Sequence, residues 1–519
     1  MTDKLVKNLN FGQEAQGKIL DGIDKLTKAV SSTLGANGKC VILEDNLGKP
    51  TITKDGITVA ESITLLDPVE NMGAALIKEA ARKTVKEAGD GTTTATILAH
   101  SILQIAKQQD DASVRWLKEG IDSAVNKTIK YLDEISIPVV DNMVEQVATI
   151  SANNDSELGK KIAQAFLAVG KTGVVAMEES DTDKTYIEIV DGIQYEKGLK
   201  NMSFVTDKAG KKAELIKPLV LIVESKIENI RKIQAVLEHV IKTNRPLLII
   251  ADADTKVLAA LAMNKIKGNI KINIVDAPNF GVTKKQVLND IALMTGATVI
   301  NEHLGDDLDL IQPEHLGECV KSVTTEYETI IQVAGISPEV QDVIEQVKKD
   351  IAKETKPGPI TRLEKRLALL SAKIANVKVG ANSDVELKEK KDRVEDAVCA
   401  TKAAIKEGIV PGGGIALLNA STKIKAANKA EQVLFDAIKS PFNIILSNAG
   451  LNPSLIRSCK MGDGIDVVTG NMVNMIDGGI IDPLLVTKSA LKNAASVATT
   501  ILSTDCVINN IRVHEGDRR

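Results

Sequence analysis

The run Gly89-Asp90-Gly91-Thr92-Thr93-Thr94 combines residue types that bind phosphate with one that binds metal, and a helical pattern follows from Thr94 to Ala99. Glycines let the main chain approach a ligand closely, hydroxyls donate hydrogen bonds, and the first N–H groups of a helix carry a partial positive charge. A carboxylate such as Asp90 can hold Mg²⁺ beside phosphate oxygens. The run also fits a capped helix start without a ligand, because Asp-Gly favours turns and Thr caps helices. It therefore indicates a candidate nucleotide site.

Two further glycine-rich turns have the same character. Thr33-Leu34-Gly35-Ala36-Asn37-Gly38 precedes a strand-like stretch, and Pro411-Gly412-Gly413-Gly414 precedes the apolar residues 415–418. Three acids elsewhere, Asp55, Asp396 and Asp482, could position metal, water or ribose, although each alone fits a helix cap or a surface charge better. Three such turns together with carboxylates strengthen the case for a nucleotide site.

Composition narrows the class of protein. With 519 residues the chain exceeds what one hydrophobic core usually supports, so we expect about three domains. Six Phe, four Tyr and one Trp leave a core of aliphatic side chains and no aromatic platform for single-stranded nucleic acid. The net charge of −4 also argues against a nucleic-acid partner.

Cysteine usage and hydropathy indicate the compartment. The five cysteines are odd in number and scattered, without Cys-x-x-Cys spacing, so neither disulfides nor a zinc site is expected. The N-terminus has no apolar signal core, and no apolar run reaches the roughly 20 residues of a membrane span. We therefore expect a cytoplasmic protein with no membrane partner.

Patterns along the chain predict different kinds of structure in different segments. The N-terminal and C-terminal parts read as mostly helical, and the glycine-rich turns are divided between them. The middle of the chain alternates helical stretches with short apolar runs, which indicates α/β structure with parallel strands. Those runs are Leu219–Val223, Pro246–Ile250 and Ile270–Val275.

Helix signals place two further features. Ser337-Pro338 favours a helix start, and Lys356-Pro357-Gly358-Pro359 interrupts two charged amphipathic segments, so an αα-hairpin is expected there. A separate helix is expected over Val385–Lys406, and it carries Asp396. Because that helix is remote in sequence from the phosphate-binding run, a moving segment would have to deliver Asp396.

These motifs, in this order and spacing, resemble the group I chaperonins, the GroEL-like, bacterial-type 60-kDa class, over almost the whole chain. The matching segments are Thr33-Leu34-Gly35, Thr53-Lys54-Asp55-Gly56, Gly89 to Thr94, Ile150-Ser151-Ala152-Asn153, Arg393-Val394-Glu395-Asp396-Ala397 and Gly412-Gly413-Gly414. The resemblance implies a multi-domain fold with a mostly α equatorial ATP-binding domain (residues 1–137 and 408–519), a small α+β intermediate domain (138–191 and 375–407) and an α/β apical substrate-binding domain (192–374). It also implies hinges at Pro138, Gly192 and Gly408.

The function implied by the resemblance is that of an allosteric, ATP-dependent chaperone. Such a protein forms a homo-oligomeric ring, here expected to have seven subunits in one or two rings, binds non-native polypeptides and uses ATPase activity to move its apical domains. ATP and Mg²⁺ are the implied cofactors, with K⁺ as a further candidate, and a lid co-chaperonin is a candidate partner. The alternative is a nucleotide-binding holdase on the same scaffold with weak or no turnover.

The resemblance also assigns roles to residues. Asp90 is the implied metal ligand, Asp396 is expected to orient the attacking water, and Asp55 is a second catalytic candidate. The implied ATP-binding residues are Thr33, Leu34, Gly35, Lys54, Asp90, Gly91, Thr92, Thr93, Thr94, Ile150, Asn153, Gly412, Gly413, Asp466, Val467, Val468, Ile480 and Asp482. The implied polypeptide-binding residues are Leu199, Met202, Phe204, Leu237, Leu258, Ala262 and Met263. Of these, an exposed patch is expected from Leu199, Met202, Phe204, Leu258 and Met263.

Some positions leave alternatives open or depart from the family pattern. Leu237 also falls on the stripe Ile230, Ile233, Leu237, Val240 and Ile241, whose spacing is equally that of a buried helix face. Ala36-Asn37 stands where the family usually has Pro-Lys, which predicts a looser turn and weaker nucleotide binding. Asp466 brings an acid to the expected nucleoside end, so base contacts there are uncertain from the sequence.

Overall fold

The chain folds into two structural units, each built from segments that are far apart in the sequence. Unit 1 comprises residues 1–164, 179–186 and 379–519, and unit 2 comprises residues 165–178 and 187–378. The computed structural model describes residues 7–44, 48–109, 113–170, 173–180, 182–195, 197–207, 211–277, 281–302, 305–354, 357–371, 373–452 and 460–510. Two units do not separate the expected intermediate domain, so the three-domain boundaries stay a prediction.

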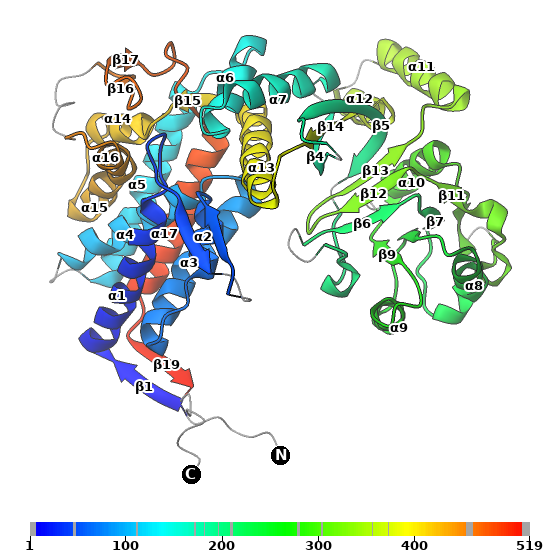
Figure 1. The fold of residues 1–519 in the computed structure, drawn as a ribbon, viewed down its shortest axis with the longest axis horizontal. Helices are drawn as coiled ribbons and strands as arrows, with labels where there is room; N and C mark the ends of the chain where they lie inside the picture. The colour runs from blue at the N-terminus through cyan, green and yellow to red at the C-terminus, as the bar shows by residue number, and fades with distance from the viewer. Residues whose placement is uncertain are drawn as a thin grey trace. The chain divides into compact units, whose positions relative to one another are not determined.

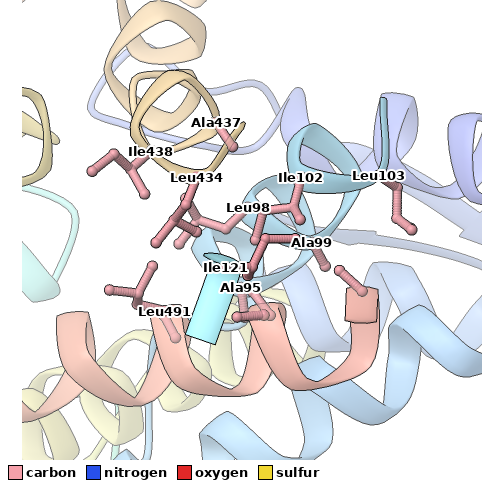
Figure 2. Packing of buried hydrophobic residues seen from close by; sticks show 14 of the residues in the cluster. Ala95, Leu98, Ala99, Ile102, Leu103, Ile121, Leu434, Ala437, Ile438 and Leu491 are labelled. Atoms are coloured by element: carbon pink, nitrogen blue, oxygen red, sulfur yellow. The ribbon is translucent and has the colours of Figure 1, made fainter. Parts of the chain in front are cut away.

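Unit 1 is built around a group of amphipathic helices (Figure 1), and these helices bury aliphatic side chains against one another. They are α1 (Gly12–Ser31), α3 (Pro68–Ala88), α4 (Thr92–Lys107), α5 (Val114–Ile135), α15 (Lys429–Ala437) and α17 (Leu484–Leu502). Figure 2 shows Leu98 and Ile102 of α4 packed among Ile121, Leu434 and Leu491 from three other helices. Because α4 is central to this core, its N-terminus has a fixed position in unit 1.

Unit 1 has further helices and strands beside these. The helices are α2 (Gly56–Ser62), α6 (Asp141–Ser151), α13 (Asp384–Glu407), α14 (Ile415–Lys423) and α16 (Ser440–Asn448), while α7 (Ser156–Val169) runs from unit 1 into unit 2. Four antiparallel ribbons pair β1 (Lys7–Phe11) with β19 (Cys506–Asn510), β2 (Val41–Glu44) with β3 (Pro50–Thr53), β15 (Ile409–Pro411) with β18 (Ile481–Pro483) and β16 (Asp463–Ile465) with β17 (Met472–Asn474). The β15–β18 ribbon joins two segments that carry expected site residues.

Unit 2 contains the parallel strands expected from the three apolar runs. The sheet has the order β10 (Val299–Ile300), β7 (Leu219–Val223), β8 (Leu247–Ile250), β9 (Ile272–Val275), and β11 (Gly317–Glu318) pairs antiparallel with β7. Alternate residues face opposite sides, so Leu221 and Ile249 join a core with α8 (Gln234–Thr243) and α9 (Thr255–Ile266), whereas Ile222 and Leu248 join another with α10 (Gly281–Thr295). Burial on both faces explains why these strands read as continuous apolar runs.

A second sheet of unit 2 has the order β4 (Val174–Glu179), β14 (Lys373–Val379), β5 (Tyr186–Tyr195), β13 (Thr329–Val333), β12 (Lys321–Thr324), β6 (Ala213–Ile216). The expected αα-hairpin is present as α11 (Pro338–Lys353) and α12 (Pro357–Leu370), and Ser337 caps α11 by accepting from Val340 N. The fold class, with a mostly helical part and an α/β part, is therefore confirmed. Among the described residues, no helix is both long enough and apolar enough to cross a membrane.

Candidate functional site

A cavity of about 360 Å³ lies within unit 1 and brings together most of the expected nucleotide residues. Its volume falls in the range of small-molecule sites. The expected residues that line it are Thr33, Leu34, Gly35, Lys54, Asp55, Asp90, Gly91, Thr92, Thr93, Thr94, Ile150, Asn153, Asp396, Gly413, Asp466, Val467, Val468, Ile480 and Asp482. The turns, strands and helices that carry these residues are far apart in the sequence, from Thr33 to Asp482.

Gly412 is the expected nucleotide residue that does not line this cavity. Its N–H donates to Ile480 O at 2.9 Å, and a Cβ on it would lie 2.9 Å from Ile481 N. The small residue is needed here because two backbone segments approach closely. Gly412 therefore supports the cavity wall from behind, while Gly413 faces the cavity.

The phosphate-binding run ends in the N-terminus of α4, which begins at Thr92, two residues earlier than the sequence pattern predicted. Gly91 is the N-cap in the left-handed region, with φ 90°, and supplies no capping side chain. The first intrahelical bond runs from Ala95 N to Gly91 O, so the N–H groups of Thr92, Thr93 and Thr94 have no partner within the helix. These three donors line the cavity and suit an anion.

Asp55 and Asp90 are held by the backbone beside this helix start. Asp55 is the N-cap of α2 and accepts from Ile57 N and Thr58 N, so the capping role considered from sequence is real and coexists with a place at the cavity. Asp90 accepts from the N–H of Gly91. Burial raises the pKa of Asp90, and the nearby Asp55 raises it further. The site is thus poor in positive charge around Asp90.

Asp396 reaches the same cavity from α13, which covers the residues expected from sequence with one extra residue at each end. Burial raises the pKa of Asp396 well above its ordinary value, and repulsion from Asp90 and Asp55 adds to the effect. A carboxylate placed so takes up a proton or a cation readily. This makes Asp396 suitable for accepting a proton from water.

Asp392 is a site residue that the sequence reasoning missed. It lines the cavity one helical turn before Asp396, and burial together with repulsion from Asp55 raises its pKa to about 6. The signal was available, because residues four apart share a helix face. On a helix rich in charge, however, such spacing is equally that of a solvated surface.

Positive charge enters the cavity wall at Lys54 and Arg393. Lys54 Nζ donates to Asn153 Oδ1 at 2.6 Å, and Arg393 Nη1 lies 3.5 Å from Asp155 Oδ2. Burial lowers the pKa of Lys54, and the nearby Arg393 lowers it further. Both cations lie among the carboxylates of Asp55 and Asp392, so this part of the cavity is polar and suited to phosphate and metal.

Another part of the cavity wall is apolar. Ile415, Phe442, Leu446, Ile465 and Met475 form one buried cluster, and all five line the cavity. The chain therefore encloses a space with charged groups on some walls and aliphatic or aromatic groups on others, which matches the two chemical parts of a nucleotide. Phe442 and Met475 gave no local sequence signal, because only the fold brings them to the cavity.

The turn after β16 is held by the side chain of Asp466. The Asp466 carboxylate accepts from Val468 N at 2.9 Å and from Thr469 Oγ1 at 2.7 Å, so it is engaged within its own turn. The Asp466 carboxylate therefore shapes the loop at the cavity wall, and contact of Asp466 with a nucleotide stays a prediction. Burial and the nearby Asp90 raise the pKa of another acid at the cavity, Asp482, to about 7.

The carboxylates fit a single Mg²⁺ held together with phosphate. In the part of the chain that the structure describes, no group of three or more His, Cys, Asp or Glu side chains could hold a metal by itself. Mg²⁺ is usually bound by one or two carboxylates, with phosphates and waters completing its shell. The raised pKa of Asp90 shows a carboxylate that a cation would stabilise.

The expected polypeptide-binding residues of unit 2 differ in exposure. Met202 and Met263 are exposed, and Leu199, Leu237 and Leu258 are half-buried against the core. Phe204 is fully buried and Ala262 is 6% exposed, so the expectation that Phe204 lies in an exposed patch is wrong. The ring of Phe204 lies in the core beside β9 and α9, where burying an aromatic side chain is more favourable than exposing it.

The stripe around Leu237 is resolved into two environments. Ile233 and Val240 are buried, Ile230 and Leu237 pack partly against the core, and Ile241 is exposed. The buried-face interpretation therefore holds for Ile233 and Val240, and polypeptide binding by Leu237 stays a prediction.

The expected hinge residues occupy ordered positions. Gly408 has φ 92°, and beside it Ile137 and Ile409 exchange two backbone hydrogen bonds of 2.9 Å, so Pro138 and Gly408 are neighbours in unit 1. Gly192 lies within β5 opposite Gln332. Their role as hinges stays a prediction.

Comparison with known proteins identifies the family of the chain. A model of the TCP-1/cpn60 chaperonin family matches residues 26–512. Among solved structures, the chain is similar to the chaperonin gp146 from the bacteriophage EL 2 (Pseudomonas aeruginosa), crystallised in the presence of ATP-BeFx. Crystal form II is 22% identical with a TM-score of 0.73, covering 98% of this chain and 100% of that chain. Crystal form I is 22% identical with a TM-score of 0.64, covering 97% and 99%. At this identity the likeness shows a shared fold.

Proposed function

Because the chain belongs to the TCP-1/cpn60 chaperonin family, we propose that it is an ATP-driven, ring-forming chaperonin that binds non-native polypeptides and promotes their folding. The observation that carries this proposal is the cavity of unit 1, where the free N–H groups of α4, a cluster of carboxylates and an apolar wall meet. The known structures of the related phage chaperonin, crystallised with ATP-BeFx, support a nucleotide as the ligand.

Different residues of the cavity bind phosphate, activate water and hold the metal in the proposed hydrolysis. The N–H groups and hydroxyls of Thr92, Thr93 and Thr94 bind phosphate oxygens, and Lys54 adds positive charge. Asp396 orients the attacking water and accepts its proton, and Asp55, fixed as a helix cap at the same cavity, is the second catalytic acid. Mg²⁺ held by Asp90 would neutralise charge on the phosphates. K⁺ is a second candidate cation, to which no described feature assigns residues.

Polypeptide binding is proposed for the exposed apolar side chains of unit 2. Lys265 Nζ of α9 donates to the carbonyls of Ser203 and Val205 and so ties the loop of Met202 to the helix of Met263. The two methionines are 56% and 53% exposed, and flexible thioethers adapt to many apolar partners. Half-buried Leu199 and Leu258 would extend this surface.

Ring assembly is proposed from the exposed ribbons of unit 1. Phe11 and Ile508 on the β1–β19 ribbon and Ile42 on the β2–β3 ribbon are each more than half exposed. Two-stranded ribbons with open edges and apolar side chains are typical of surfaces that pair with another chain. We expect rings of seven copies, single or double, with ATP coupling neighbouring sites.

The test compares wild type with Asp396→Ala. Purified protein should release phosphate from Mg-ATP without any small-molecule acceptor, and the variant should lose about 100-fold or more of this rate while keeping nucleotide affinity. Refolding of a denatured polypeptide should depend on this hydrolysis. Wild-type protein that binds client and nucleotide without turnover would favour the holdase alternative, and absence of nucleotide binding would contradict both.

A further inference from the structure

The side chain of Asn37 connects two turns that line the nucleotide cavity. Asn37 Nδ2 donates to Val467 O at 3.1 Å, across 430 positions of sequence. On one side of this bond Leu34, Gly35 and Ala36 line the cavity, and on the other side Ile465, Asp466 and Val467 line it. The bond therefore fixes one part of the cavity wall relative to another.

Each of the two turns is held by its own contacts. Asn448 Nδ2 of α16 donates to Ser31 O and Leu34 O at 3.0 and 2.9 Å, and Lys39 N donates to Ser32 O. In the second turn Asp466 N donates to Asn471 O at 2.9 Å, in addition to the bonds that the Asp466 carboxylate accepts. Two stiff turns joined by a hydrogen bond move relative to each other mainly by breaking that bond.

The two turns differ in chemistry. Ile465 belongs to the apolar cluster and Val467 packs against it, whereas the first turn lies near the cation Lys54, whose Nζ is 3.4 Å from Ala36 O. A ligand with an apolar ring and a charged tail would contact both turns at once. The distance between its two subsites then depends on Asn37.

From these contacts we propose that Asn37 is a positioning residue. Its hydrogen bond to Val467, which we call the clasp, holds the turn of residues 465–467 against the turn of residues 34–36 and so slows release of bound nucleotide. This inference rests on the proposed function. The clasp bond is exposed to solvent, so water competes for both partners and the bond opens readily. It also reverses the sequence expectation that Ala36-Asn37 would only weaken nucleotide binding.

Asn37→Ala removes the donor and leaves every other bond of the two turns in place. Release of a fluorescent ADP analogue, chased by excess ADP and followed by stopped-flow, should accelerate about 3- to 10-fold, the effect of one neutral hydrogen bond. Asn37→Asp should accelerate it at least as much, because a carboxylate cannot donate and repels the carbonyl. Asn269→Ala, at an exposed asparagine of unit 2 that also makes a side-chain bond, is the matched control and should release ADP like wild type.

Two readouts separate a positioning role from a structural one. The thermal unfolding midpoint and the kcat for phosphate release should not fall in Asn37→Ala, while KM for ATP rises. Unchanged ADP release in both Asn37 variants overturns the clasp and leaves the proposed function standing, and a parallel loss of kcat and thermal stability also overturns it. If wild type hydrolyses nothing but binds ADP, faster release in the variants still supports the clasp. If wild type binds no nucleotide, the clasp and the proposed function fall together.

Discussion

Asp392 and Asp396 lie one turn apart on α13, and both line the nucleotide cavity of unit 1. The charge of Asp392 is one of several that raise the pKa of Asp396, together with burial and the carboxylates of Asp90 and Asp55. The wall that would meet the terminal phosphate therefore contains more negative charge than one metal and one water require. This excess predicts how the site responds to pH.

Asp392→Asn should tighten nucleotide binding at pH 8. Burial and Asp55 raise the pKa of Asp392 to about 6, so its side chain is ionised at pH 8 and repels phosphate, whereas asparagine does not. One charge at this range is worth about 1 kcal/mol, or roughly fivefold in Kd. Because Asp392 becomes protonated below pH 6, the difference between variant and wild type should vanish near pH 5.

The measurement for Asp392 is the Kd of a fluorescent nucleotide between pH 5 and pH 8. Glu119→Gln is the control, because Glu119 is exposed on α5 and is not among the residues lining the cavity. Equal Kd values for Asp392→Asn and wild type at pH 8 would show that the charge is screened.

Gly91→Ala should weaken both stability and nucleotide binding. The residue would have to adopt φ 90°, which costs about 1–2 kcal/mol, and its Cβ would lie 2.7 Å from Val486 Cγ1. Movement of the α4 N-terminus would misplace the N–H donors of Thr92 and Thr93. Thermal unfolding and nucleotide titration measure the two losses.

A second glycine separates strain from packing. Gly12 has φ 58° with nothing within 4 Å of an added Cβ, so Gly12→Ala should show the backbone cost alone. If both variants bind nucleotide equally well, the geometry at Gly91 does not matter for the ligand.

The sequence predicted the parts of this structure that have local signals. The parallel strands of unit 2 were predicted from short apolar runs, because both faces of their sheet are buried. The helix α13 was predicted from its charged composition. Glycine-rich turns with acids indicated a nucleotide site, and most residues of those turns line one cavity of unit 1. Phe442 and Met475 could not be found, since apolar residues look alike until the fold brings them to one place.

Exposure was harder to predict than position. Phe204 and Met202 are two residues apart and were expected in one exposed patch, yet the ring is buried and the thioether is exposed. The difference depends on the core between β9 and α9, which no local pattern describes. Asp466 shows the same limit, because whether an acid faces a ligand or caps its own turn is decided by backbone geometry.

Ile42→Asp should disrupt assembly without unfolding the subunit. The side chain is 70% exposed on the β2–β3 ribbon, so the substitution removes little buried surface in the subunit but places a charge in the proposed contact. Sedimentation velocity should shift from a ring to small species while far-UV circular dichroism is unchanged. Leu310→Asp, at a similarly exposed apolar residue of unit 2, should leave the ring intact, and an intact ring in Ile42→Asp would exclude this ribbon from the interface.

Glu178→Gln should destabilise unit 2 in a pH-dependent way. Burial by itself raises the pKa of Glu178, but hydrogen bonds from Lys321 and Lys378, at 2.8 and 2.5 Å, outweigh it and hold the pKa below its ordinary value of 4.5. A carboxyl group whose pKa is lowered by folding contributes stability above its unfolded pKa and loses it as pH falls through the folded pKa. The variant should lose about 1–3 kcal/mol at pH 7, because two partly buried ammonium groups lose their nearest carboxylate and keep the more distant Glu214 and Glu188, each at 3.7 Å. Thermal unfolding should show this gap closing below pH 4.5, with Glu179→Gln, a change at the exposed neighbour, close to wild type throughout. If the difference in stability between variant and wild type is unchanged at pH 3, Glu178 stabilises unit 2 through packing rather than through its charge.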